Sequence, residues 1–312
     1  MTHITGFSIL LLLVCSAFPA YANDCQQADD FVRQAYDLGD SPANYPQQRR
    51  LLQQALTLCP AHAEAHNNSG WIFEQQGQLD EALSHYQQAV KADPQFANAR
   101  AGIGRIYERR KQFPLALEAY LQACPQKPEL SRQVKILLEN NRYQVADENR
   151  ILDKESLLLL FDRARREEMK RMLEKCSFRS GEDFGTRGVA VKPAADFPNI
   201  LFDLGKATLK PASLRQIEEI GAALQAFGAV QVIVNGHTDK TPFAGVSDPA
   251  ENLRLNTQLS KERARTVTEE FTRLGVPRDR MESNGYGPQR PLVDADTPEA
   301  YAQNRRVEIE VR

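Results

Sequence analysis

The stretch Val230-Gln-Val-Ile-Val-Asn-Gly-His-Thr-Asp239 decides the fold of the C-terminal third of this 312-residue chain. Valines alternate along its first half, which predicts a β-strand, and its polar second half predicts a loop that leaves the strand. Pro211 opens a helix before the stretch and Ser260 caps one after it. The apolar residues of these two helices recur at helical spacing: Leu214, Ile217, Ile220 and Leu224, then Ala264, Val267 and Phe271.

Three further strands are predicted around this centre, at Ile200–Phe202, Met281–Tyr286 and Val307–Val311. Strands separated by helices indicate a mixed sheet with crossover helices packed on it. The C-terminal third is therefore expected to be an α+β domain.

Five motifs of this region resemble, in the same order, the OmpA-like peptidoglycan-binding domain. They are Phe202 with Leu209-Lys-Pro211, Gly236-His-Thr-Asp239, Asn256 with Leu259-Ser-Lys-Glu-Arg-Ala264, Gly285-Tyr-Gly287 with Pro291, and Asn304-Arg-Arg-Val-Glu308. The resemblance covers a little over a third of the chain and implies a domain at residues 197–312. It also implies the function of that family, which holds the diaminopimelate of the peptidoglycan stem peptide without cleaving it.

The resemblance implies a clamp for this ligand. Diaminopimelate presents an ammonium and a carboxylate close together, and by resemblance Asp239 takes the ammonium and Arg263 takes the carboxylate. We expect Arg263 in the first turn of its helix, where free backbone N–H groups also favour a carboxylate. Asn256 and Thr238 match positions near the ligand, and Thr238 is expected to act through its backbone N–H.

Supporting roles are expected for three neighbours of the clamp. His237 is expected to be a packed, hydrogen-bonded residue at the strand end, whereas Arg305 and Arg306 are expected to brace the sheet and loops, with either one a candidate to line the site. The segment 240–255 is longer than in shorter members of the family. Three roles are open for this segment: it covers the site as a lid, it contacts the glycan, or it alters the selectivity for the ligand.

Composition argues against several other classes of function. The formal charge is −2, and residues 190–312 carry 16 basic and 17 acidic side chains, so strong electrostatic attraction to nucleic acid is not supported. Histidine is scarce and no metal-ligand spacing occurs, so no metal or other cofactor is expected. The sequence also lacks a catalytic Cys–His setting, which argues against a peptidoglycan-cleaving enzyme.

The N-terminal half repeats with a period of 34 residues. The pairs in register are Gly70 and Gly104, Phe73 and Tyr107, Ala82 and Ala116, Tyr86 and Tyr120, and Ala89 and Ala123. This pattern resembles the tetratricopeptide repeat, a helix-turn-helix unit of an all-α solenoid. We predict three repeats, at Cys25–Pro60, Ala61–Pro94 and Gln95–Pro128, within residues 23–130. The resemblance implies a docking surface for an envelope protein that the sequence does not identify, and a pure spacer is the alternative.

Between the repeats and the C-terminal domain, amphipathic segments at residues 130–138 and 155–173 are expected to cap the array. Residues 131–178 are therefore predicted as connecting helices, with the charged segment 163–168 facing solvent. The glycine-containing segment 179–196 is predicted as a linker.

The first 22 residues predict a secretory signal. Their apolar core is Phe7–Val14, and Ala20-Tyr-Ala22 is an A-x-A cleavage site. The apolar run is shorter than the roughly 18–20 residues that cross a bilayer, so no transmembrane segment is expected in the mature chain. Cys15 stands in a sequence that resembles a lipobox, but Val14 is bulkier than the small residue expected there.

Four cysteines follow the signal, namely Cys25, Cys59, Cys124 and Cys176. In an oxidising compartment they permit two disulfides in three connectivities. Cys25 begins the first helix of the first repeat and Cys59 ends the second. Because antiparallel helices bring these ends together, we predict that Cys25 pairs with Cys59, which leaves Cys124 and Cys176 for a second bridge.

These features predict a non-catalytic periplasmic adaptor associated with peptidoglycan or the outer membrane. The C-terminal domain would bind the wall and the repeats would dock a protein partner. The alternative is an envelope assembly scaffold in which wall binding is only a tether.

Overall fold

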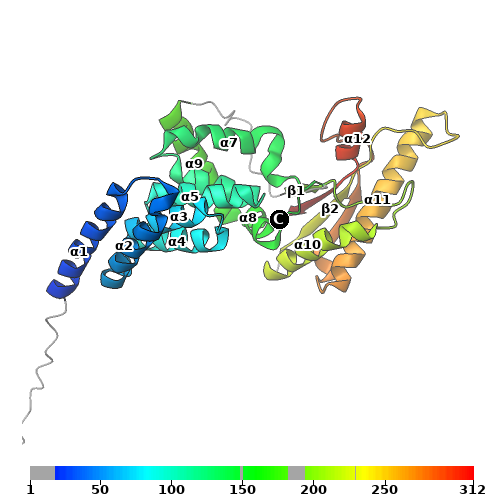
Figure 1. Cartoon of the computed structure of the whole chain (residues 1–312). Helices are drawn as coiled ribbons and strands as arrows, with labels where there is room; N and C mark the ends of the chain where they lie inside the picture. Colours follow the sequence, from blue (N-terminus) through cyan, green and yellow to red (C-terminus); the bar gives the residue numbers. More distant parts are fainter. Residues whose placement is uncertain (1–17, 148–149, 182–193, 229) are drawn as a thin grey trace, which may run out of the picture. The chain divides into compact units, whose positions relative to one another are not determined.

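The computed structural model describes residues 18–147, 150–181, 194–228 and 230–312. The chain divides into two compact units, the first ending at Gly102 and the second running from Ile103 to Arg312 (Figure 1). The predicted apolar signal core and Cys15 lie outside the described residues. Helix α1 (Phe18–Asp37) runs through the predicted cleavage site.

The first unit is made of helices, and its amphipathic faces pack against one another. It contains α1, α2 (Tyr45–Leu58), α3 (Ala63–Gln75), α4 (Leu79–Ala92) and the first turns of α5 (Ala97–Arg109). Helix α1 packs on α2, and α3 packs on α4. These pairs, and α5 with α6 (Phe113–Ala123), correspond to the three predicted repeats, except that α1 begins at Phe18, seven positions before Cys25.

The 34-residue period has a packing cause. A side chain at Gly70 would lie 2.9 Å from the ring of Tyr86, and one at Gly104 would lie 2.4 Å from the ring of Tyr120. In both repeats the glycine therefore makes room for a buried tyrosine of the following helix. Each tyrosine hydroxyl donates a 2.7 Å hydrogen bond to a glutamate, Glu74 for Tyr86 and Glu108 for Tyr120.

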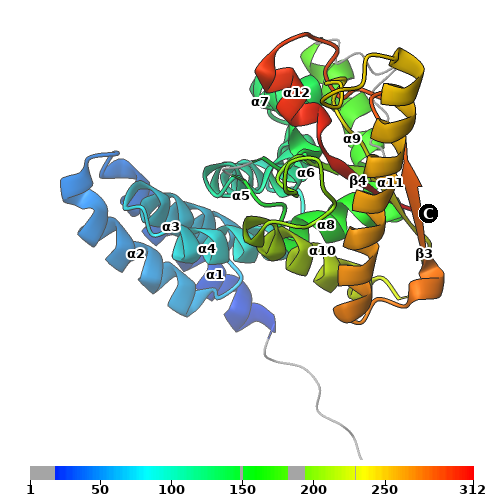
Figure 2. The same ribbon diagram turned by 90° about the vertical axis from the view of Figure 1, so that its right-hand side faces the viewer.

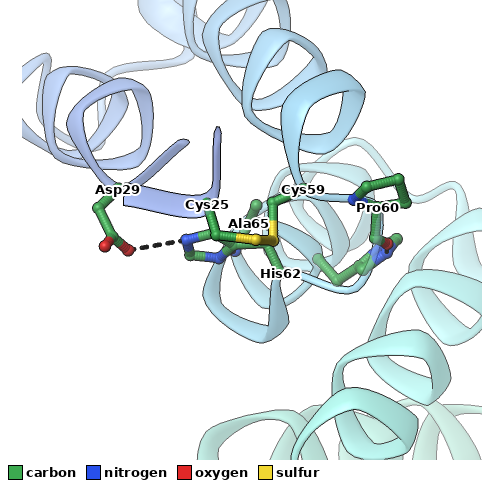
Figure 3. Close-up of a disulfide and its surroundings, with 7 residues drawn as sticks. Cys25, Asp29, Cys59, Pro60, His62 and Ala65 are labelled. Atoms are coloured by element: carbon green, nitrogen blue, oxygen red, sulfur yellow. Dashed lines mark hydrogen bonds and ion pairs between the residues drawn. A yellow bond between two sulfur atoms is a disulfide. The ribbon is translucent and has the colours of Figure 1, made fainter. Parts of the chain in front are cut away.

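Both predicted disulfides are present. Cys25 and Cys59 are joined with their Cα atoms 4.9 Å apart, and Figure 3 shows this bridge linking the start of the first repeat to its end. Cys124 and Cys176 form the second bridge, with Cα atoms 5.2 Å apart and both residues fully buried. The predicted pairing of Cys25 with Cys59 is confirmed, although Cys25 is the eighth residue of α1 and does not begin the helix.

The second unit begins with helices that continue from the repeats. They are the rest of α5, α6, α7 (Ser131–Leu138), α8 (Lys154–Phe161) and α9 (Arg163–Ser180). Asp162 separates the last two because its side chain accepts from the Arg165 backbone N–H at 3.0 Å and caps α9. The prediction that residues 163–168 all face solvent is wrong for Arg166, which is buried and donates to the Leu160 carbonyl at 2.8 Å.

The C-terminal part of this unit is a four-stranded mixed sheet. Its strands are β1 (Ala194–Phe197), β2 (Val232–Gly236), β3 (Met281–Gly285) and β4 (Val307–Val311), in the order β1-β4-β2-β3. Strand β4 is antiparallel to both its neighbours, and β2 is parallel to β3. The crossover between the parallel strands is α11 (Pro249–Arg273), which packs against both of them and against α10 (Leu214–Ala226), as Figures 1 and 2 show. The predicted fold class, an all-α repeat array followed by an α+β domain, is confirmed.

Three details of the predicted sheet domain are wrong. The first strand is Ala194–Phe197, and residues 200–202 form no strand beyond an isolated antiparallel bridge of Phe202 with Leu209. Leu214 is 45% exposed because it stands at the first turn of α10. Ser260 does not cap a helix: α11 begins at Pro249, where the Asp248 side chain accepts from the Ala250 N–H at 3.1 Å and proline suits the first position.

Within the second unit, the connecting helices lie directly on the sheet domain. The Gln216 side chain accepts from the Leu152 backbone N–H at 3.0 Å and donates to the Leu152 carbonyl at 2.9 Å. The Ala146 N–H donates to the Asp196 carbonyl of β1 at 2.9 Å. Of the predicted linker, residues 182–193 lie outside the described part, while its two ends belong to α9 and β1.

Among the described helices, none has the length and apolar character that crossing a membrane requires.

Candidate ligand site

The candidate site lies where β2 ends beside the middle of α11. A side chain at Gly236 would meet the Ser260 carbonyl oxygen at 1.9 Å, and one at Gly285 would meet the Lys261 nitrogen at 2.4 Å. Only glycine permits this close approach of strands β2 and β3 to the helix backbone. The two glycines explain why those motifs matter, since they bring the loop after β2 next to the helix that carries Arg263.

Asp239 follows β2 and is 6% exposed. Its Oδ2 accepts a 2.5 Å hydrogen bond and ion pair from the Arg305 guanidinium, and its Oδ1 accepts from the Thr241 backbone N–H at 2.8 Å. Burial alone would raise the pKa of Asp239, but these hydrogen bonds outweigh it and hold the pKa below its ordinary value. The carboxylate is therefore ionised at neutral pH and oriented by its partners.

Arg263 lies in the middle of α11 and is 8% exposed. Its Nε donates to the Lys206 carbonyl at 3.0 Å, and its guanidinium lies 5.0 Å from the centre of the Phe202 ring. Within the described part of the chain, no carboxylate forms an ion pair with it. Burial lowers the pKa of Arg263, and the neighbouring Arg305 lowers it further, while Asp239 acts in the opposite sense.

The expectation that Arg263 stands in the first turn of a helix is wrong, because α11 starts fourteen positions earlier at Pro249. The helix N-terminus therefore contributes no free N–H groups beside it. What favours an anion here is the buried guanidinium itself, together with the nearby Arg305.

Thr238 and Asn256 are both buried beside the clamp. The expectation that Thr238 offers its backbone N–H is wrong, since that group donates to the Gly287 carbonyl at 3.0 Å. Its hydroxyl oxygen instead has no hydrogen-bond partner among the described residues. The Asn256 side-chain amide donates to the carbonyls of Thr241 at 3.3 Å and Asn252 at 3.2 Å, so it braces the loop that orients Asp239.

His237 is a buried residue at the strand end. Its ring stacks on Tyr286 with the centres 5.5 Å apart, and its Nε2 lies 3.2 Å from a carboxylate oxygen of Glu308. Burial lowers the pKa of His237, although the bond to Glu308 opposes this shift. This surrounding matches the packed, hydrogen-bonded environment expected for His237.

The two arginines before β4 face different partners. Arg306 is 7% exposed and its Nε pairs with Asp196 of β1 at 2.5 Å, so it braces the sheet. Arg305 has a side chain that is 48% exposed and pairs with Asp239. Of the two candidates, the structure brings Arg305 to the clamp.

The segment 240–255 is only partly a loop, because its second half forms the first two turns of α11. Asn252 fixes the turn before the helix: its side chain accepts from the Phe243 N–H at 2.7 Å and donates to the Val246 carbonyl at 2.8 Å. Lys240 forms an ion pair with Asp296.

Sequence reasoning missed the two groups that surround Arg263, namely Phe202 and the Lys206 carbonyl. Phe202 was part of a recognised motif, but nothing in its spacing indicated a contact with a residue sixty positions away. In the described part of the chain, no cluster of three or more His, Cys, Asp or Glu side chains is arranged to hold a metal ion.

Comparison with known proteins divides the chain in the same way. Residues 201–305 match the sequence model of the OmpA family, and residues 43–95 and 75–131 match the tetratricopeptide repeat. Both resemblances seen in the sequence are therefore confirmed.

Individual relatives match about a third of the chain. The chain is 38% identical over 111 residues to the probable lipoprotein YiaD of Escherichia coli, a match that covers 36% of this chain and 47% of that protein. It is 34% identical over 112 residues to the peptidoglycan-binding protein ArfA of Mycobacterium bovis, covering 36% of this chain and 32% of that one. The chain thus spans less than half the length of these relatives.

Among solved structures, the periplasmic domain of Helicobacter pylori MotB is similar at 26% identity with a TM-score of 0.34. That alignment covers 38% of this chain and 72% of the MotB chain.

Proposed function

We propose that this chain, with its OmpA-family segment at residues 201–305 and its tetratricopeptide repeats, is a non-catalytic peptidoglycan-binding protein. The observation that carries the proposal is the guanidinium of Arg263, which is 8% exposed and has no carboxylate partner in the described part of the chain. A buried charge without a counter-ion is costly, so an anion of the ligand is its natural partner. The relative ArfA, which is named as peptidoglycan-binding, is similar over 36% of this chain.

The ligand group that fits the site is the zwitterionic end of diaminopimelate. Its carboxylate pairs with the Arg263 guanidinium, for which two parallel N–H···O bonds are the preferred geometry. Its ammonium pairs with Asp239, whose two oxygens each accept one hydrogen bond from the described residues and have further lone pairs. Arg305 is half exposed, so its side chain can shift to share Asp239 with the incoming ammonium.

Around the headgroup, the Thr238 hydroxyl is available as a further hydrogen-bonding group. Asn256 acts by holding the loop at Thr241, whose N–H in turn orients the Asp239 carboxylate. These side chains bind and orient the headgroup, and the proposed domain holds the stem peptide without cleaving it.

The protein acts in the periplasm, associated with peptidoglycan or the outer membrane. Support comes from relatives whose names include a lipoprotein and an outer membrane porin, and from two disulfides, which form in oxidising compartments. The helical repeats dock a partner protein of the envelope, which makes the chain an adaptor between that partner and the wall.

Co-sedimentation of the mature chain with diaminopimelate-type peptidoglycan tests the clamp. Asp239→Ala and Arg263→Ala each leave one charge of the ligand without its partner, which typically costs about 2–5 kcal/mol. At about 1.4 kcal/mol per tenfold this is a loss of roughly 30-fold or more. The double variant is expected to bind little worse than either single variant, because both residues act on one headgroup.

Arg265→Ala is the matched control, since Arg265 lies on the same helix but its side chain is 73% exposed and pairs with Glu269 at 3.2 Å. An exposed pair contributes about 0–1 kcal/mol, so this variant should pellet almost as well as the unaltered chain. Equal pelleting of Arg263→Ala and Arg265→Ala, with unchanged circular dichroism, would contradict the clamp.

A further inference from the structure

An open cleft in the first unit lies beside the Cys25–Cys59 disulfide. It has a volume of about 470 Å³ and is lined by the middle of α1 around Cys25 and Asp29, the start of α3 and the turn before α5. Figure 3 shows one side of it, where His62 lies next to the bridge and bonds to Asp29 at 2.9 Å. The disulfide thus joins two of the segments that form the walls.

The cleft is acidic. Asp29, Glu64 and Asp93 line it, and the Asp29 side chain is 62% exposed. No lysine or arginine is among the described residues that line the cleft. Arg100 of α5 donates to the Pro94 carbonyl, in the turn that forms one wall of the cleft, at 3.0 Å and 2.6 Å.

The charge of the whole unit agrees with that of its cleft. Residues 23–102 carry ten acidic and five basic side chains, a formal charge of −5, whereas the full chain has −2. The rest of the chain is therefore slightly basic, and the negative charge is concentrated in the repeat unit. Such a field attracts cationic segments and accelerates their association.

The cleft also has an apolar side, formed by Cys25, Ala63 and the half-buried ring of Phe96. The start of α3, which would otherwise favour an anion, is already satisfied there: the His62 Nδ1 accepts from the Ala65 N–H at 3.2 Å, and Glu64 stands in the first turn. An aliphatic stem that ends in a cation matches both sides of this cleft.

We infer that the cleft binds a basic segment of the partner protein, with a lysine or arginine head between Glu64 and Asp93 and its stem on Phe96. The inference rests on the proposed docking role of the repeats and names the chemistry of what they dock. Its occupant is a peptide that carries Lys or Arg beside an aliphatic residue.

Fluorescence anisotropy with three labelled twelve-residue peptides tests this inference on the mature chain. The peptides share one sequence of Leu and Ser with Lys, Gln or Glu at every third position. The Lys peptide is expected to bind at least tenfold more tightly than the Gln peptide, and the Glu peptide not at all. Glu64→Gln with Asp93→Asn should remove most of that tenfold preference, and Asn retains the oxygen that accepts from the Gln95 N–H at 2.9 Å.

Asp40→Asn with Glu81→Gln is the control. Both residues are exposed and lie outside the cleft, and their replacement removes the same charge. The control should leave the preference for Lys within twofold of the unaltered chain. An equal loss of the preference for the Lys peptide in both double variants would mean that binding depends on the overall charge, and would contradict binding in the cleft. If the Gln or Glu peptide bound most tightly, the repeats would still dock a peptide, but the inferred basic character of that peptide would be wrong. If none of the three peptides bound, the proposed docking role itself would be wrong.

Discussion

The two charged sites of this chain differ in how far their charges are buried. Asp239 and Arg263 are 6% and 8% exposed, whereas the Asp29 side chain in the N-terminal cleft is 62% exposed. Buried charges interact strongly but only with a ligand of matching geometry, while exposed charges attract many cations weakly. The comparison suggests that the sheet domain supplies specificity and the repeat unit supplies a general preference for basic segments.

The same contrast applies to the glycines of the two units. A side chain at Gly236 would meet backbone, the Ser260 carbonyl at 1.9 Å, whereas one at Gly70 would meet the Tyr86 ring at 2.9 Å. A ring can shift by a few tenths of an ångström, but a strand and a helix held by their own hydrogen bonds cannot.

The largest effect is therefore expected for Gly236→Ala, at about 3–5 kcal/mol of lost stability in the sheet domain. Gly70→Ala should cost only about 1–3 kcal/mol in the repeat unit. Trp71 of α3 is the only tryptophan in the chain, so its fluorescence reports on the repeat unit alone. Gly236→Ala should abolish wall binding and leave the Trp71 melting curve unchanged. A Trp71 melting curve that shifts more for Gly236→Ala than for Gly70→Ala would contradict this difference between the two units.

Removal of the first disulfide is expected to act only on the repeat unit. The bridge spans 34 residues, and its loss in Cys25→Ser with Cys59→Ser should lower stability by about 2–4 kcal/mol through the entropy of the unfolded chain. The Trp71 melting temperature should fall while wall pelleting of the folded protein at 10–20 °C below that temperature remains. Lost pelleting with an unshifted Trp71 melt would contradict the division of roles.

Ionic strength should separate the two sites. The Debye length falls from about 10 Å at 0.1 M salt to about 3 Å at 1 M, which screens exposed charges far more than buried ones. Three exposed ion pairs between lysines of the peptide and carboxylates of the cleft, at about 0.2–1 kcal/mol each, amount to roughly tenfold in affinity. The Lys peptide should therefore lose about that much affinity at high salt. Wall binding should change by less than about threefold over the same range. NaCl titrations of both interactions measure this difference. A larger loss of affinity for the wall than for the Lys peptide would contradict the burial argument.

The smallest expected effect is a loss of stability of the repeat unit at acidic pH. His85 of α4 lies with its Nδ1 3.1 Å from the Nδ1 of His66, and burial, followed by the charges of His66 and Arg49, lowers the pKa of His85 to about 4. The unfolded chain binds protons at about pH 6.5, so stability is complete above that pH and declines as the pH falls towards 4.

Because His85 is partly exposed, the loss is discounted to about 1 kcal/mol, or roughly 4–8 °C in the Trp71 melt between pH 7 and pH 4.5. His85→Asn should flatten this dependence. An identical pH slope in the variant would assign the acid sensitivity to other groups.

The repeats were predictable from the sequence because their contacts are local. Gly70 and Tyr86 lie in consecutive helices, and the same relation recurs in Gly104 and Tyr120, so the period of the sequence reports the packing directly. The disulfide Cys25–Cys59 followed from the same helix geometry.

The site could be predicted only through the family's motifs, and its detail could not. Arg305 and Asp239 are 66 positions apart, and Arg263 reaches the carbonyl of Lys206 across 57 positions. No periodicity encodes such distant contacts. The start of α11 was misplaced because Asp248-Pro249 is a stronger helix start than Ser260, yet it lies inside a segment whose length had marked it as a loop.

The most direct test of the clamp compares two stem tripeptides, one with diaminopimelate and one with Lys at the third position, by isothermal titration calorimetry. Lys lacks the second carboxylate and leaves Arg263 without its partner. The unaltered chain should therefore bind the diaminopimelate peptide roughly 30-fold more tightly or better, as for one lost partner of a buried charge pair. Arg263→Ala should bind both peptides weakly and equally. A preference for diaminopimelate that persists in Arg263→Ala would contradict the account.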